Sequence, residues 1–481
     1  MSKKITSNLI WRFLERFGAE GVSTIVTIVL ARLLEPSVYG TIALVTVFTS
    51  LLQNFVDTGF SSALIQKKDA DDVDFSSIFW FNVATAIVLY TGMFFAAPLI
   101  ARFYDMPELT AVVRVMSLIL FVSAFKNVQH AYVSRNMIFK KFFYATLTGT
   151  ITAAVVGVWM AYKGFGVWAL VAQNLVNQAI DTVCLWLIVD WRPIFVFNWK
   201  RFKGLFNYGY KLLLSGLIDT AYSKLRTLVI GKVYTSDDLA FYNKGDLFPS
   251  TVVGNINSAV LSVLFPAFSS KQDNPETVKA MAKRGIKTAT YLIMPMTAGL
   301  AACAAPLVSI VLTDKWLPSV FFMRIACFSY SFYVIHSINL NVMKGMGRSD
   351  YFLKLEIIKK VMGIAVVFAT MFISVKAMAL STIFTSVASQ IINSWPNRKL
   401  ISYNYLEQLK DMLPSIALSG AMGLIVYCVS FLGLGNWATL LIQVPLGVAL
   451  YLGGSVLFKM ESFTYLWTTM AKPMLSKLRK Q

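Results

Sequence analysis

Five polar side chains in a hydrophobic stretch near the start of the chain fall on one face of a helix. They are Arg12, Arg16, Glu20, Ser23 and Thr27, which follow one another at steps of four, four, three and four residues. An ionisable side chain inside a membrane costs at least about 2.5 kcal/mol, so such groups normally face a bundle interior or a wet cavity. A face with both bases and acids suits a cavity that binds an anionic group and also takes up a coupling cation.

The same polar face recurs about 200 residues later. Adding 199 to each number gives Lys211, Ser215, Asp219, Tyr222 and Arg226, so that a base again opens the series and an acid again stands third. After a slip of one residue the offset is 200, which aligns residues 36–40 with 236–240 and Asp57 with Asn257. We interpret this shared register as an internal duplication. Transporters built from such repeats often hold their substrate at the repeat interface.

These positions predict which side chains do the chemistry. Guanidinium and ammonium groups pair with phosphate oxygens, so the predicted substrate-binding residues of a cationic cavity are Arg16, Lys211, Arg226 and Arg324. A carboxylate in a low-dielectric cavity can take up a proton, and the predicted candidates for ion coupling are Glu20, Asp57, Asp219 and Asp246. For each residue the alternative is an internal ion pair, or a side chain that extends to the membrane surface. No catalytic residue, metal site or cofactor is predicted, apart from a coupling proton or sodium ion.

The composition places these residues in a membrane protein. Of the 481 residues, 57% are hydrophobic and 14% are charged, against roughly 25% charged in soluble proteins, which excludes a soluble globular enzyme. About 20 apolar residues are enough to cross the hydrocarbon core. We predict fourteen spans, near residues 9–34, 38–64, 76–98, 111–133, 143–162, 166–189, 205–230, 238–268, 284–312, 318–343, 352–375, 377–396, 412–432 and 437–458.

The predicted fold is therefore an all-α polytopic membrane protein. The repeat divides it into an N-terminal six-helix bundle (1–200), a C-terminal six-helix bundle (201–405), and a terminal helix pair with a basic cytoplasmic tail (406–481). The net charge of +20 comes mainly from Lys and Arg residues in alternate loops. Such an excess marks the cytoplasmic side, so we expect both termini in the cytoplasm and no nucleic-acid partner.

Several short motifs extend this interpretation. They are residues 30–40 (LARLLEPSVYG), 57–60 (DTGF), 63–67 (ALIQK), 79–83 (FWFNV), 264–268 (LFPAF), 314–316 (DKW) and 344–348 (KGMGR). Together they resemble the bacterial polysaccharide flippases of the MOP (MATE-like) superfamily, and most of all the colanic-acid type, from about residue 5 to about residue 400. The resemblance implies two six-helix bundles around a central cavity and alternating access. It also implies that an undecaprenyl-diphosphate-linked sugar unit moves from the cytoplasmic to the periplasmic leaflet.

The sequence thus favours a multi-pass flippase of the bacterial inner membrane, not an enzyme, that exports a lipid-linked oligosaccharide for capsule, exopolysaccharide or lipopolysaccharide synthesis. Membrane lipids, a polysaccharide polymerase and its assembly machinery are the further candidate partners. The alternative is a cation-coupled exporter of drugs or metabolites from the same superfamily, which would favour an acid-dominated cavity and twelve spans. A membrane-embedded polymerase or acyltransferase would usually show a sizeable periplasmic loop or a polar catalytic cluster.

Overall fold

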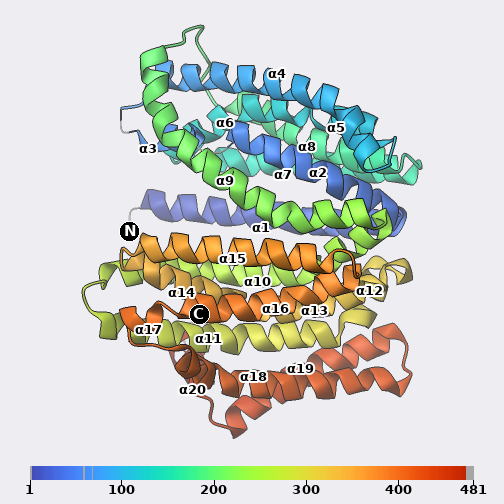
Figure 1. The fold of residues 1–481 in the computed structure, drawn as a ribbon, viewed down its shortest axis with the longest axis vertical. Helices are drawn as coiled ribbons and strands as arrows, with labels where there is room; N and C mark the ends of the chain where they lie inside the picture. Colours follow the sequence, from blue (N-terminus) through green and yellow to red (C-terminus); the bar gives the residue numbers. More distant parts are fainter. Residues whose placement is uncertain (1–2, 58–59, 68, 473–481) are drawn as a thin grey trace. The chain divides into compact units, whose positions relative to one another are not determined.

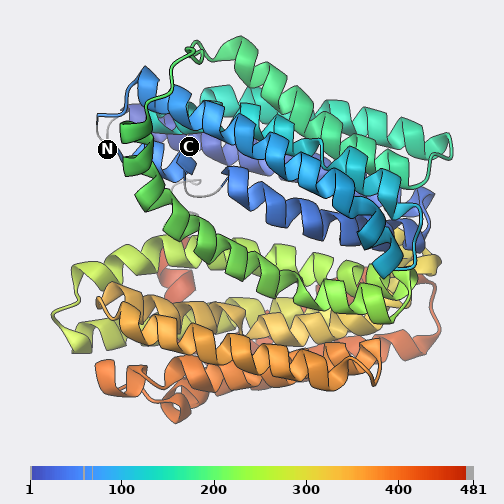
Figure 2. The same cartoon turned by 45° about the horizontal axis from the view of Figure 1, so that its top comes forward.

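The chain folds into helices joined by short turns and loops. The computed structural model describes residues 3–57, 60–67 and 69–472, and no β-strand occurs in these ranges. Backbone amides in lipid find no water to bond, so membrane-spanning segments satisfy them internally as helices. The chain forms two compact units, Met1–Ala240 and Phe241–Gln481, and within each unit the long helices lie side by side with roughly aligned axes (Figures 1 and 2). The predicted all-α fold is confirmed.

The helices of the first unit are α1 (Lys3–Leu33), α2 (Pro36–Asp57), α3 (Phe60–Gln66), α4 (Asp72–Phe103), α5 (Leu109–Met116), α6 (Ile119–Arg135), α7 (Lys140–Tyr162), α8 (Val167–Ile188) and α9 (Trp199–Val233). Next comes α10 (Ser236–Ser270), inside which the boundary between the units falls. The second unit continues with α11 (Pro275–Ala302), α12 (Ala304–Leu312), α13 (Ser319–Ser331), α14 (Tyr333–Gly345), α15 (Ser349–Thr370), α16 (Val375–Ser394), α17 (Asn397–Leu400), α18 (Tyr405–Cys428), α19 (Asn436–Leu457) and α20 (Glu461–Leu466).

Helix boundaries repeat along the chain as the duplication predicts. Helix α1 ends at Leu33 and α9 at Val233, and α2 begins at Pro36 and α10 at Ser236, an offset of 200 in both cases. Further on, α6 ends at Arg135 and α14 at Gly345, an offset of 210. Helix boundaries of the first half of the chain thus recur 200 to 210 residues later. After the second set come α18 and α19, whose helices lie side by side (Figure 1).

The predicted number of fourteen spans is not confirmed. In the described residues, nine helical segments are long and apolar enough to cross a membrane, or ten if the bent pair α11–α12 counts as one span. Helices α1, α8, α9 and α15 are not among them. These four helices carry polar side chains within their apolar stretches, for example Gln178 and Asp181 in α8, and Lys354 and Lys359 in α15.

Four predicted spans are interrupted in the structure. Those near 111–133 and 318–343 have only short breaks, between α5 and α6 and between α13 and α14. The span near 38–64 ends as α2 at Asp57, and the short helix α3 follows. The span near 284–312 is broken at Cys303, where α11 and α12 meet with a bend of 70°. Pro306 lies in the first turn of α12, where a missing amide hydrogen costs little, whereas in a continuous helix it would remove an internal hydrogen bond.

Polar residues in the connecting turns define where the long helices begin. Asn198, Asn274, Ser374 and Asn404 each accept a hydrogen bond from a backbone N–H in the first turn of α9, α11, α16 and α18. Asp71 does the same for α4 within a capping box completed by Asp74. Arg201 donates a hydrogen bond to Asp71 and thereby lowers the pKa of this carboxyl. Such caps satisfy the amides that a helix start leaves unpaired.

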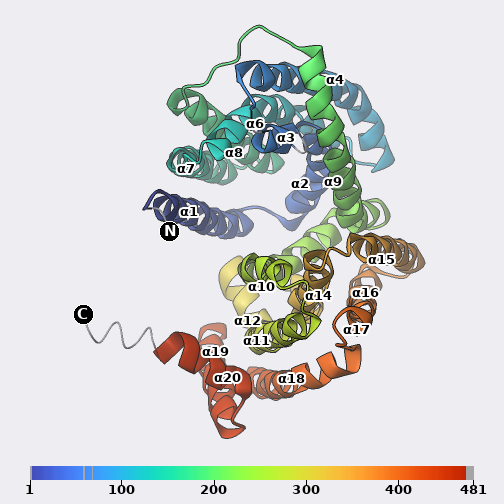
Figure 3. The same ribbon diagram turned by 90° about the vertical axis from the view of Figure 1, so that its left-hand side faces the viewer.

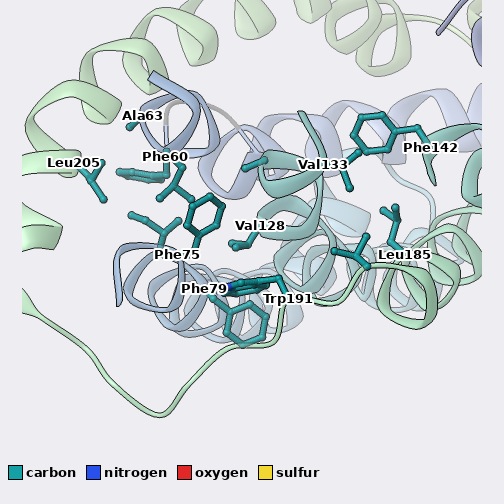
Figure 4. Close-up of a cluster of buried hydrophobic side chains, with 14 of the residues drawn as sticks. Phe60, Ala63, Phe75, Phe79, Val128, Val133, Phe142, Leu185, Trp191 and Leu205 are labelled. Atoms are coloured by element: carbon teal, nitrogen blue, oxygen red, sulfur yellow. The ribbon is translucent and has the colours of Figure 1, made fainter. Parts of the chain in front are cut away.

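Each unit has a hydrophobic core of its own. In the first unit, Phe60 of α3, Phe75 and Phe79 of α4, Val128 of α6 and Leu185 of α8 pack together (Figure 4). Helix α9, which the predicted division at residue 200 assigns to the second bundle, packs against α2, α3 and α4. In the second unit, α10, α11 and α14 surround another core (Figure 3). The predicted division into domains stays a prediction.

Candidate functional site

The polar stripe of α9 lies on an exposed face of its unit. Asp219 and Ser215 are exposed, and Arg226 and Tyr222 are half-buried. On α1, Glu20 and Ser23 are likewise exposed and Thr27 is half-buried. Charged side chains are too costly to leave against lipid, so these faces belong against water, substrate or other protein. Three predicted site residues, Arg16, Asp57 and Lys211, have side chains outside the part that the structure describes.

Helix α9 is held in place by polar and close-packed contacts to α2. The amide of Asn54 donates a hydrogen bond of 2.7 Å to the hydroxyl of Thr220, one residue after Asp219. Gly231 lies five residues after Arg226 and has no side chain. A Cβ atom at this position would collide with the side chain of Leu44 on α2. These contacts fix the height and rotation of α9 against α2 and therefore the direction in which its polar face points.

Asp246 is the predicted residue that lines a cavity in the second unit. The cavity has a volume of about 270 Å³ and is bounded by α10, α13, α14 and α16. The hydroxyl of Tyr330 donates a hydrogen bond of 3.2 Å to the carboxylate of Asp246. The other polar side chains in the wall are Tyr242, Tyr333, His336, Ser329, Thr382 and Ser386. A carboxylate surrounded by hydroxyl groups suits a proton or a hard cation, which prefers oxygen ligands.

The side chains around Asp246 were not predicted from the sequence. Tyr330 and Tyr333 are two of 20 tyrosines, and only the packing of α13 and α14 against α10 brings them to the carboxylate. His336 is not among the predicted site residues, but it lines the cavity. Its Nδ1 atom is buried and has no hydrogen-bond partner among the residues that the structure describes. The available signal was the presence of Asp246 in α10, Tyr330 in α13 and Tyr333 in α14, which are polar or amphipathic side chains in largely apolar helices.

Arg324 has a different environment from that of Asp246. Its Nε atom donates a hydrogen bond of 3.2 Å to the carbonyl of Ala301 at the end of α11. Its guanidinium lies 4.9 Å from the ring centre of Tyr427 on α18. Within the described residues Arg324 is not part of the wall of the Asp246 cavity. These contacts connect α13, α11 and α18, and a role of Arg324 in substrate binding stays a prediction.

Ionisable residues also pair inside the first unit. Lys126 of α6 lies 3.0 Å from a carboxylate oxygen of Asp181 of α8, and it also donates a hydrogen bond to Gln178. The Lys126 and Asp181 side chains are only 17% and 7% exposed. This pair joins two helices and carries no net charge, so it is not a cationic site for a ligand.

An apolar groove of about 530 Å³ runs along α11, α18 and α19 in the second unit. Its polar groups bond within the protein. Gln443 donates to the carbonyl of Val426 at 3.0 Å, and Tyr291 donates to Ser455 at 3.0 Å. The surface left to a ligand is therefore hydrocarbon. In the described residues no three His, Cys, Asp or Glu side chains come together in a group that could hold a metal ion.

The sequence matches a known protein family and several named relatives. The model of a family described as polysaccharide biosynthesis protein matches residues 29–321. A succinoglycan biosynthesis transport protein of Rhizobium meliloti is 27% identical over 66% of this chain, and the match spans 64% of that relative. A teichuronic acid biosynthesis protein of Bacillus subtilis is 25% identical over 80% of each chain. A lipopolysaccharide biosynthesis protein of Escherichia coli is 22% identical over 68% of this chain and 67% of its own length.

Solved structures show the same architecture. The lipid II flippase MurJ in an inward closed conformation superposes with a TM-score of 0.75 at 15% identity, over 94% of this chain and 98% of the flippase. An inward-facing multidrug resistance MATE transporter of the MOP superfamily gives a TM-score of 0.64 at 16% identity, over 79% of this chain and 94% of that transporter. At this identity the likeness concerns the fold, which the chain shares with both transporters.

Proposed function

The chain belongs to the polysaccharide biosynthesis protein family, and from this membership we propose that it is a flippase. It moves an undecaprenyl-diphosphate-linked oligosaccharide across the bacterial inner membrane by alternating access, for the synthesis of a surface polysaccharide. Relatives named for succinoglycan transport and for teichuronic acid and lipopolysaccharide biosynthesis support a sugar polymer as the destination. The fold shared with a lipid II flippase supports a lipid-linked sugar as the cargo.

The observation that carries this proposal is the exposed polar face of α9. A membrane helix keeps ionisable side chains such as Asp219 and Arg226 on an exposed face only where water, substrate or protein covers them. Arg226, together with Lys211 and Arg16, offers cationic groups to the diphosphate. In this proposal the sugar and diphosphate follow the polar faces of α1 and α9 while the lipid tail stays in the bilayer. Arg324, held by Ala301 and Tyr427, contributes positive potential rather than a direct contact.

The proposed coupling site is the cavity around Asp246. Taking up a proton or sodium ion neutralises the carboxylate and changes its hydrogen bond with Tyr330, so the packing of α10 against α13 depends on the ion. Glu20, Asp57 and Asp219 are the other coupling candidates. The excess of Lys and Arg in alternate loops supports a cytoplasmic location for both termini. In this function the protein is a transporter that carries out no covalent step and works beside a polysaccharide polymerase.

A deletion strain tests the cargo directly. Extracted lipids are analysed by mass spectrometry for undecaprenyl-diphosphate-linked oligosaccharide, and the surface polymer is stained. A flippase deletion accumulates the lipid-linked unit and loses surface polymer, and the wild-type gene restores both. An unchanged lipid-linked pool together with new sensitivity to cationic drugs refutes the flippase and supports the cation-coupled efflux alternative.

Arg226→Ala tests the α9 face in the same strain. Loss of a charge-assisted contact worth about 1.5–3 kcal/mol slows export about tenfold or more, without loss of protein from the membrane. Arg102→Ala is the matched control, because Arg102 is an exposed arginine in the last turn of α4 and lies outside the stripe. Equal export by the two variants would show that Arg226 does not bind the substrate.

A further inference from the structure

A further cavity in the second unit has a volume of about 550 Å³ and a wall that is partly polar and partly apolar. It lies where α11, α18 and the turn from α19 to α20 meet. One part of its wall is polar and is formed by Lys287, Asp411, Ser415, Lys459, Glu461 and Ser462. The other part is apolar and includes Ala417, Leu418 and Ala421 of α18. Small alanines one helical turn apart leave space beside α18 that larger side chains would fill. The proposed transport function makes no use of this cavity.

The cavity lies at the level along α11, α18 and α19 where the charged parts of these helices and their flanks end and their apolar parts begin. On α11 no charged residue follows Lys287 before the helix ends, and on α18 none follows Asp411. The third helix, α19, contains no charged residue, and Lys459 follows two residues after its end. Three such transitions at one place mark a membrane–water interface. The surrounding excess of Lys and Arg is that of the predicted cytoplasmic side.

The polar wall holds both signs of charge in a defined arrangement. Lys287 bridges two carboxylates, at 2.7 Å from Glu461 and 3.4 Å from Asp411. Its hydrogen bond lowers the pKa of Glu461, which stays ionised. Glu461 is still 72% exposed, so one side of its carboxylate remains open to a ligand. Lys459 is also exposed and makes no ion pair with any residue that the structure describes.

The backbone of Lys459 gives a second reason to look for a ligand there. Its φ is +49°, and the N–H of Met460 bonds back to the carbonyl of Ser455 at 2.9 Å, as in the Schellman ending of a helix. Glycine is favoured at that position because a Cβ atom is strained at positive φ. Helix termination therefore does not require lysine here, and non-glycine strain of this kind tends to gather at functional positions.

We propose that this cavity binds a zwitterionic aminophospholipid of the phosphatidylethanolamine type from the leaflet on the Lys- and Arg-rich side. The phosphodiester accepts from Lys459 and from the hydroxyl of Ser462. The ammonium group donates to the open side of Glu461. The glycerol and the first carbons of an acyl chain lie along Ala417, Leu418 and Ala421.

Charge complementarity selects this occupant over other lipids. The wall contains two cations and two carboxylates, which matches a head group with one phosphate and one ammonium. A purely anionic phospholipid places no cation against Glu461 and Asp411. A diphosphate-linked carrier brings at least two negative charges toward the same two carboxylates. A trimethylated head group keeps the charge but has no N–H to donate to them.

Native mass spectrometry of the full-length, delipidated protein in detergent tests the proposal. The protein is titrated with phosphatidylethanolamine, phosphatidylglycerol and phosphatidylcholine that have the same acyl chains. We expect one tightly bound phosphatidylethanolamine, bound more tightly than the other two. Lys459→Gly removes the ammonium while it suits the backbone, so the melting temperature stays equal or rises. Binding weakens about fivefold, which corresponds to about 1 kcal/mol for a basic residue at a membrane surface.

Two further variants make the outcome specific. Lys410→Gln removes an exposed cation of α18 that lies outside the cavity wall, and we expect it to leave phosphatidylethanolamine binding unchanged. Glu461→Gln removes the acceptor for the ammonium, so the preference for phosphatidylethanolamine over phosphatidylglycerol falls toward one. Unchanged binding in Lys459→Gly overturns the proposal. So does equal affinity of the wild type for all three phospholipids, or displacement of the bound lipid by undecaprenyl phosphate at equal concentration.

Discussion

Lys126 and Asp181 show how a charge is tolerated inside this protein. Their 3.0 Å ion pair is almost buried and lies between α6 and α8. The exposed acids Glu20 and Asp219 belong to a different class, because they lie on helix faces that the core of their unit does not cover. A buried pair is a structural device, whereas exposed charge on a membrane helix is a reason to look for substrate.

We predict that breaking the buried pair destabilises the protein more than removing it. Lys126→Met leaves Asp181 as an uncompensated buried charge, which should cost about 3–5 kcal/mol. The double variant Lys126→Met, Asp181→Leu removes both charges and should recover most of that loss. Unfolding in detergent, followed by circular dichroism, measures the wild type, Lys126→Met, Asp181→Leu and the double variant. If the double variant is at least as unstable as the sum of the two single variants, the pairing has no energetic role.

The sequence predicted part of the site and missed another part for a physical reason. Positions such as Asp219 and Arg226 stand out because an ionisable group in an apolar helix is rare. The partners of Asp246 do not stand out, since tyrosine and serine are common in membrane helices and their meeting depends on tertiary packing. Lys126 and Asp181 likewise lie 55 positions apart, so only the packing of α6 on α8 identifies them as a pair.

At the scale of the elements, the two copies of the repeat end the same helix with different residues. The turn after α6 has Met137 at φ +54°, and the equivalent turn after α14 has Gly347 at φ +72°. The hydrogen bonds match, from Ile138 to Val133 in one copy and from Arg348 to Met343 in the other. Both copies thus have the same turn with a positive φ, but only the second copy has glycine, the residue that suits a positive φ best.

This difference gives a prediction in both directions. Met137→Gly should stabilise the protein by about 0.5–1 kcal/mol, because glycine has no Cβ strain at positive φ and Met137, 44% exposed, contributes little to the core. Gly347→Met should destabilise it by a similar amount. Thermal unfolding of the two variants beside the wild type is the measurement. A loss of stability in Met137→Gly would show that packing of the methionine outweighs its backbone strain.

Gly40 marks a place where two elements touch through their backbones. A Cβ atom at this buried position of α2 would overlap the backbone carbonyl of Ser236 at the start of α10. Gly40→Ala should therefore destabilise the protein by about 1–3 kcal/mol, the usual cost of overpacking. Gly92→Ala in α4 is the matched control, since no atom outside its own helix lies within 4 Å of the added Cβ. That variant should gain up to about 1 kcal/mol of helix propensity, and equal behaviour of the two would argue against the close approach.

At the scale of the whole molecule, hydropathy and register predicted the all-α class and the repeat. They did not define the spans one by one. Helices α8 and α15 are polar enough to fail a hydropathy test, because each carries charged or amide side chains such as Asp181 and Lys359 within its apolar sequence. The 70° break at Cys303 also escaped, since Pro306 is compatible both with a kink and with the first turn of a new helix.

Orientation in the membrane is the testable property at this scale. In a variant without Cys184, Cys303, Cys327 and Cys428, single cysteines replace Lys163, after α7, or Lys410, in α18; both lysines are exposed. The excess of Lys and Arg predicts Lys163 outside and Lys410 in the cytoplasm. A membrane-impermeant maleimide should label Lys163→Cys in intact cells and Lys410→Cys only after the membrane is broken. The reverse pattern would invert the topology.

The passage from one compact unit to the next runs through the interior of a helix. The boundary falls between Ala240 and Phe241, within the 35 residues of α10, a rod about 52 Å long at 1.5 Å per residue. A flexible linker would let the units drift independently, whereas a rod transmits force and torque. Pro249 lies eight residues after Phe241 and removes one internal hydrogen bond of α10, so near the boundary a bend in this rod costs least at Pro249.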